Sequence, residues 1–114
     1  LSGSMEPVNP GIDAKALAER LTAGGITLVD VRSPEEHEDE RIPGSTLVPI
    51  DAFDPRRVTA DTAGRTLVLY CMSGTRSTRA AALFAPAGLP APITLREGIF
   101  GWKAAGLPTE GSGV

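Results

Sequence analysis

The residues with the clearest chemical potential surround the only cysteine of the chain. Cys71 follows an apolar run, residues 67–70, and precedes small polar residues with one glycine. The apolar run is typical of a buried strand, so the thiol stands at a strand's carboxyl end, where ligand sites of open α/β sheets lie. Backbone N–H groups in a tight loop at this place form a concavity that binds anions. The same positive environment lowers the pKa of a thiol and favours the nucleophilic thiolate.

The loop after Cys71 is the predicted substrate-binding segment. Gly74 permits a tight turn, the neighbouring hydroxyls can donate hydrogen bonds, and Arg76 places a cation five positions after the thiol. A lone cysteine after an apolar strand can also be a small buried hydrophobe, and Arg76 can be a solvated charge at a helix start. The polar composition of the loop favours an anion site instead. Its residues are Met72, Ser73, Gly74, Thr75, Arg76 and Ser77.

Other titratable residues are given supporting or structural roles. Asp30 and Arg32 stand at the end of a second apolar run, and a carboxylate and a guanidinium near strand ends typically form an ion pair or hydrogen-bond network. His37 lies in an acidic helix that we expect to be exposed, and a thiolate held by loop amides needs no histidine base. No His, Cys or carboxylate cluster has metal-ligand spacing, and no nucleotide-binding motif is present. We therefore expect neither metal nor cofactor.

Strand and helix patterns alternate along the chain. Strands are predicted over 26–31, 45–50, 67–70 and 92–95, and helices over 13–21, 33–38, 53–58, 76–85 and 98–105. Asp13 and Ser33 are candidate N-caps, Pro34 suits a first helical position, and Gly24 with Gly25 supplies a helix end. This alternation predicts an α/β domain with a mostly parallel sheet and helices on both faces.

Composition narrows the class of protein. The 114 residues, 41% of them hydrophobic, suit one domain, and a net charge of −3 gives no indication of a nucleic acid or membrane partner. A single cysteine excludes an intrachain disulfide and favours a reducing compartment, so we expect a cytoplasmic protein. We interpret residues 1–10 as a tag remnant, Leu1 to Ser4, that is followed by a flexible tail. We interpret residues 11–110 as the domain and residues 111–114 as a second flexible tail.

Four stretches, in order, resemble the signatures of the single-domain rhodaneses, a family of sulfurtransferases. Residues 28–36, Leu-Val-Asp-Val-Arg-Ser-Pro-Glu-Glu, resemble the first signature, and residues 41–45, Arg-Ile-Pro-Gly-Ser, resemble the His-Ile-Pro-Gly-Ala turn. Residues 70–77, Tyr-Cys-Met-Ser-Gly-Thr-Arg-Ser, resemble the active-site loop, and residues 98–108 resemble the closing signature. The similarity extends from residue 12 to about residue 110.

The resemblance implies a rhodanese-like fold with a five-stranded sheet and Cys71 as the sulfur carrier. The thiolate would take a sulfane sulfur from an anionic donor, thiosulfate or a persulfide, and the Cys71 persulfide would pass it to cyanide or a thiol, including a protein thiol. The loop amides and Arg76 would hold the donor. The sequence departs from the family at Arg41, usually His, at Met72, often Arg, and at Glu97, usually Gly. The missing loop cation weakens the case for thiosulfate as a good substrate, and Glu97 would lower the positive potential further if it faced the loop.

Two other functions remain open at this stage. Dual-specificity phosphatases with a related fold carry arginine at the sixth position after cysteine, which here is Ser77, so the loop should be too short for a phosphate and its in-line attack. A non-enzymatic binding or regulatory module is the other alternative, although the intact Cys71 and its loop argue against it.

Overall fold

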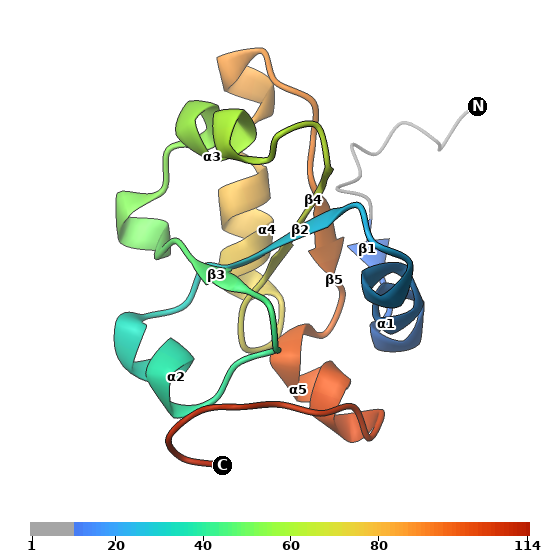
Figure 1. Cartoon of the computed structure of the whole chain (residues 1–114). Helices are drawn as coiled ribbons and strands as arrows, with labels where there is room; N and C mark the ends of the chain where they lie inside the picture. Colours follow the sequence, from blue (N-terminus) through green and yellow to red (C-terminus); the bar gives the residue numbers. More distant parts are fainter. Residues whose placement is uncertain (1–10) are drawn as a thin grey trace, which may run out of the picture.

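The computed structural model describes residues 11–114, and within them five parallel strands form one sheet in the order β1-β5-β4-β2-β3 (Figure 1). The strands are β1 Gly11–Ile12, β2 Ile26–Asp30, β3 Thr46–Leu47, β4 Thr66–Tyr70 and β5 Ile93–Leu95. The helices are α1 Ala14–Ala23, α2 Pro34–Asp39, α3 Pro55–Asp61, α4 Thr75–Ala81 and α5 Gly98–Ala104, with 3-10 turns η2 Ile50–Ala52 and η3 Ala85–Ala87. The predicted α/β class with a five-stranded sheet is confirmed.

The central strand β4 is buried on both faces of the sheet, which explains its continuous apolar sequence. Val68 and Tyr70 point into a core formed with α1 and α5, whereas Leu69 and Cys71 point into a second core formed with α3 and α4. This alternation follows from the two-residue period of a strand. Cys71 therefore emerges on the α4 face, at the carboxyl edge of the sheet.

The helix starts follow the predicted capping. The Asp13 carboxylate accepts a hydrogen bond from the Ala16 N–H at 2.8 Å. Ser33 and Glu36 form a reciprocal capping box at the start of α2, with bonds of 3.0 and 3.2 Å. These contacts satisfy N–H groups that a helix start leaves without intrahelical partners.

Several element boundaries differ from the prediction, and the helix expected over 53–58 instead forms as α3 over Pro55–Asp61. The strand expected over 45–50 is only Thr46–Leu47, because Pro49 offers no N–H to a ladder and the chain then enters η2. Helix α4 ends at Ala81 rather than near residue 85, since the Leu83 and Phe84 amides close tighter turns ahead of Pro86. Strand β1 was not predicted, because two residues show no periodicity.

The structure describes one of the two segments that the sequence analysis assigns to flexible tails. Residues 1–10 lie outside the described residues. Over residues 111–114, which the sequence analysis assigns to a flexible tail, the Ser112 and Gly113 amides donate to the Glu38 and Asp39 carbonyls, both at 2.9 Å. These carbonyls lie at the end of α2, where a helix leaves acceptors unsatisfied. The C-terminal segment consequently runs from α5 beneath α2 (Figure 1).

No helix formed by residues 11–114 combines the length and the apolar character that crossing a bilayer requires.

Candidate active site

Cys71 is the first residue after β4, and its side chain is almost completely enclosed, with 1% of the residue exposed. Its sulfur accepts N–H hydrogen bonds from Gly74 at 3.1 Å and Ser77 at 3.4 Å. The thiol in turn donates to the Ser77 hydroxyl oxygen at 3.6 Å, and that hydroxyl donates to the Gly74 carbonyl at 3.1 Å. The loop is therefore wrapped around the sulfur, as the sequence predicts.

The hydrogen bonds at the sulfur stabilise its negative form. Burial alone raises the pKa of Cys71, but hydrogen bonds from Ser77, Gly74 and the Ser73 backbone outweigh it, so the pKa lies below the usual value. Hydrogen bonds to the charged form of a group act in this direction. The site can thus hold a thiolate, or another sulfur anion in the same place, without a histidine.

A second set of contacts fixes the loop from outside. The Ile99 N–H donates to the Cys71 carbonyl at 2.9 Å, and the Phe100 N–H donates to the Met72 carbonyl at 3.0 Å. The two backbones meet at Gly98, whose φ is +60° and where a Cβ would lie 2.4 Å from both carbonyl oxygens. Only a glycine leaves room for this approach. The residue patterns alone did not predict this contact between α5 and the cysteine loop. Its only local signal is the glycine that opens α5.

Asp30 and Arg32 form the buried ion pair that the sequence predicts. The Arg32 guanidinium donates to both carboxylate oxygens, at 2.8 to 3.1 Å, and also to the Glu40 carbonyl at 2.6 Å. Burial opposes ionisation of Asp30, but hydrogen bonds with Arg32 and His37 prevail and lower its pKa. The guanidinium also lies 5.6 Å from the ring centre of Tyr70. The pair thereby ties the end of β2 to α2 and the central strand.

The expected exposure of His37 is wrong. Its Nδ1 lies 2.9 Å from the Asp30 carboxylate, and its side chain is only 17% exposed. The helix α2 turns this residue inward while Glu35 and Glu38 face outward, because residues on one helix point in directions about 100° apart. His37 is a member of the Asp30–Arg32 network.

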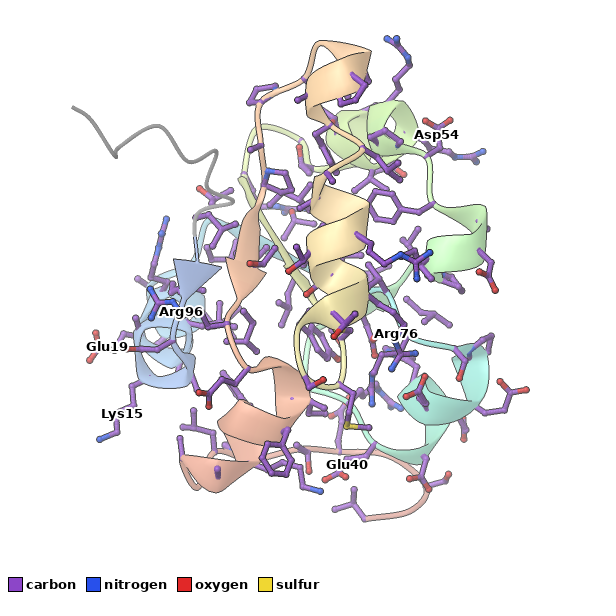
Figure 2. All side chains as sticks on the ribbon, turned by 180° about the vertical axis from the view of Figure 1, so that it is seen from behind. Lys15, Glu19, Glu40, Asp54, Arg76 and Arg96 are labelled. Carbon is purple, nitrogen blue, oxygen red and sulfur yellow. The ribbon has the colours of Figure 1, made fainter. Side chains whose placement is uncertain are left out.

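Arg76 reaches away from the loop toward α2 (Figure 2). Its two terminal nitrogens bind the two carboxylate oxygens of Glu36, at 2.6 and 3.0 Å. The hydrogen bond from Arg76 is the main cause that lowers the pKa of Glu36 to about 2. The structure therefore pairs Arg76 with a carboxylate of the protein itself, whereas the sequence analysis predicted that Arg76 binds an anionic donor.

The remaining loop residues lie at the surface. Met72, Ser73 and Thr75 are exposed, so Ser73 acts on the sulfur through its backbone alone. Met72 and Phe100, 41% and 66% exposed, border a recess of about 110 Å³ beside the loop. The recess is also lined by Arg32, Glu36, Asp39, Glu40, Ile99 and Lys103.

The two remaining departures from the family pattern lie away from the sulfur. Arg41 pairs with Glu110 at 3.1 Å and donates to the His37 carbonyl, so it fastens the C-terminal segment. Glu97 lies over Gly101 in a groove of about 290 Å³ between α1 and α5. No residue of the cysteine loop lines that groove. Glu97 consequently does not face the loop.

The sequence and the fold agree on a family. A family model described as Rhodanese-like domain matches residues 13–105. The solution structure of a rhodanese-like domain from Anabaena superposes with a TM-score of 0.78 at 29% identity, covering 93% of this chain and 82% of the other. The chain therefore belongs to the rhodanese-like domain family.

Curated relatives point the same way. The chain is 36% identical over 106 residues to an uncharacterized protein of Synechocystis, covering 93% of this chain and 59% of that protein. It is also 36% identical over 98 residues to a protein named sulfurtransferase from Allochromatium vinosum, covering 85% of this chain and 91% of the relative. The chain thus spans less than two thirds of one of these two relatives and nearly all of the other. Together with the family match, the relative named sulfurtransferase supports a sulfurtransferase family for this chain.

Proposed function

We propose that this protein is a sulfurtransferase that carries sulfur as a persulfide on Cys71. The Cys71 thiolate attacks the sulfane sulfur of a donor, the new S–S bond forms, and the bond within the donor breaks. Thiosulfate would leave sulfite, and a persulfide R–S–SH would leave the thiolate R–S⁻. Cyanide or an acceptor thiolate then attacks the outer sulfur, and the Cys71 thiolate is restored. No redox cofactor is needed, because electrons stay with the sulfur atoms that exchange.

One observation carries this proposal: the sulfur of the only cysteine accepts the Gly74 and Ser77 N–H groups inside the family's signature loop. Donors of this kind favour the thiolate as nucleophile, and they would serve equally for a persulfide anion on the same side chain. Ser77 would close the loop through its hydroxyl, and Gly74 would allow the turn with its φ of +116°. Asp30 and Arg32 would act as positioning residues beneath the recess.

The proposal also includes the cellular compartment and the route by which donors and acceptors reach Cys71. The reducing conditions of the cytoplasm would keep Cys71 free between turnovers. Small donors, with cyanide or a thiol as acceptor, would enter through the recess beside Met72 and Phe100. A protein thiol is a further acceptor consistent with the exposure of these two side chains.

Intact-mass spectrometry tests the proposal directly. The parent protein, treated with thiosulfate, mercaptopyruvate or a low-molecular-weight persulfide, should gain one sulfur that cyanide removes as thiocyanate. Cys71→Ser should fold but gain no sulfur, because an alcohol is a far poorer nucleophile at neutral pH. A folded parent that gains sulfur from none of these donors contradicts the proposal and favours a binding module. Hydrolysis of a phosphate ester by Cys71 would favour the phosphatase.

A further inference from the structure

We propose that Glu36 sets the donor specificity of this site by occupying Arg76, so that donors with two negative charges are disfavoured against donors with one charge or none. This inference deepens the proposed sulfurtransferase function and rests on it. It assigns to α2 a role in selecting the substrate, although α2 contributes no atom to the cysteine loop.

The pair between Glu36 and Arg76 is well formed for a partly open site. Both terminal nitrogens of the guanidinium are used, at 2.6 and 3.0 Å, and the side chains are 29% and 32% exposed. Two parallel N–H···O bonds are the preferred geometry of guanidinium and carboxylate. The capping box with Ser33 additionally holds the Glu36 carboxylate in place from its own helix. Glu36 is thus fixed from two sides.

The other cations near the recess are engaged in the same way. Arg32 pairs with Asp30 at 2.8 Å, and Lys103 pairs with Glu40 at 2.8 Å. Asp39 adds another carboxylate to the lining. Within the described residues, the three cations around the loop and recess therefore face at least as many acids. A thiosulfate dianion would have to displace a carboxylate from its cation or bind beside it.

A donor with less charge meets no such obstacle. A hydroxyalkyl persulfide, R–S–SH, carries at most the single charge of its terminal sulfur, and its neutral R group can lie against Met72 and Phe100. The Cys71 thiolate attacks the outer sulfur of the protonated form R–S–SH, the S–S bond of the donor breaks, and the hydroxyalkyl thiolate leaves with its electron pair. Arg76 then contributes to the potential at the sulfur without binding the donor.

The test removes the negative charge of Glu36 and keeps the shape of its side chain. Glu36→Gln leaves an oxygen for Arg76 and retains the capping box, which accepts Gln as well as Glu. Glu35→Gln is the matched control, because Glu35 is an exposed acid in the same first turn of α2 and has no ion pair with Arg76. Reaction rates of Cys71 with iodoacetate and iodoacetamide, and kcat/KM for thiosulfate and a hydroxyalkyl persulfide, are measured for both variants and the parent.

We expect Glu36→Gln, relative to Glu35→Gln, to raise the iodoacetate-to-iodoacetamide rate ratio and kcat/KM for thiosulfate by about three- to tenfold, the range of a charge-assisted contact partly open to solvent. The value for the hydroxyalkyl persulfide should change less than twofold. Equal ratios in the two variants, with sulfur transfer intact, overturn the role of Glu36. Absence of sulfur on the parent with every donor overturns the proposed function instead, and the alkylation ratio still reports on the charge at Arg76.

Discussion

Replacing Gly98 by alanine should separate the cysteine loop from the helix that anchors it. Gly98 opens α5, and its backbone touches the carbonyls of Cys71 and Met72. A Cβ at this position would lie 2.4 Å from both carbonyl oxygens, whereas real Cβ atoms essentially never approach below 3.0 Å. The loop or the helix must therefore move by at least 0.6 Å, the difference between these distances. The atoms in conflict are backbone, so a side-chain rotation cannot relieve it.

Two contributions add to the cost of this substitution. Holding alanine at a φ of +60° costs about 1–2 kcal/mol. Forcing packed backbone apart adds about 1–3 kcal/mol, by analogy with overpacked cores. The expected loss of about 2–5 kcal/mol compares with a typical total stability of about 5–15 kcal/mol for a domain. The variant should fold, but with the hydrogen bonds from Ile99 and Phe100 to the loop lengthened.

Gly106→Ala is the control for the backbone conformation. Its φ is +79°, and no atom lies within 4 Å of the Cβ position, so it should lose only the first contribution, about 1–2 kcal/mol. Urea unfolding gives the free energy of each variant, and the pH dependence of Cys71 alkylation reports on the loop. Gly98→Ala should also raise the thiol pKa, because displaced amides stabilise the thiolate less. Equal free energies of unfolding for the two variants would refute the steric reasoning.

Further predictions concern the sulfur and the buried charges. Ser77→Ala should raise the pKa of Cys71, seen as a shift of the alkylation profile to higher pH. Ser73→Ala should leave the profile in place, because Ser73 acts on the sulfur through its backbone. Equal shifts in the two variants would contradict this reasoning. Asp30→Asn should lose about 3–5 kcal/mol in urea unfolding, since Arg32 would remain buried without its counter-charge, and the exposed control Asp51→Asn should lose less than about 0.5 kcal/mol. The pKa of Glu36 falls from 4.5 to about 2 on folding, so its contribution to stability is complete above pH 4.5 and is lost as the pH falls toward 2. Glu36→Gln should therefore reduce the decline in unfolding free energy over this range, and an unchanged decline would show that the pair adds nothing.

Much of the fold could be predicted because its signals are local. The apolar run before Cys71, the cap at Asp13 and the Ser33 capping box each depend on residues within a few positions of one another. The sequence did not predict β1, because an element of two or three residues shows no periodicity. Pro49 and Pro86 ended other elements earlier than the pattern indicated.

The geometry around the sulfur was also local. Gly74 and Ser77 lie three and six positions after Cys71, so a single tight loop brings their amides to the thiol. The residue types along this loop were therefore enough to predict an anion-binding cysteine. The ion pair of Asp30 and Arg32 was predictable for the same reason, since two positions separate them.

The partners of the charged residues were decided by the tertiary structure. Glu36 and Arg76 are 40 positions apart, and they meet because α2 and the start of α4 both lie at the carboxyl edge of a parallel sheet. Local patterns show which residues are charged, but a guanidinium binds whichever acid the packing of the helices brings to it. The inward turn of His37 and the C-terminal segment beneath α2 have the same origin. The environment of the sulfur could be predicted because its contacts lie within residues 71–77, whereas the packing of α2 near the start of α4 brings Glu36, rather than another acid, to Arg76.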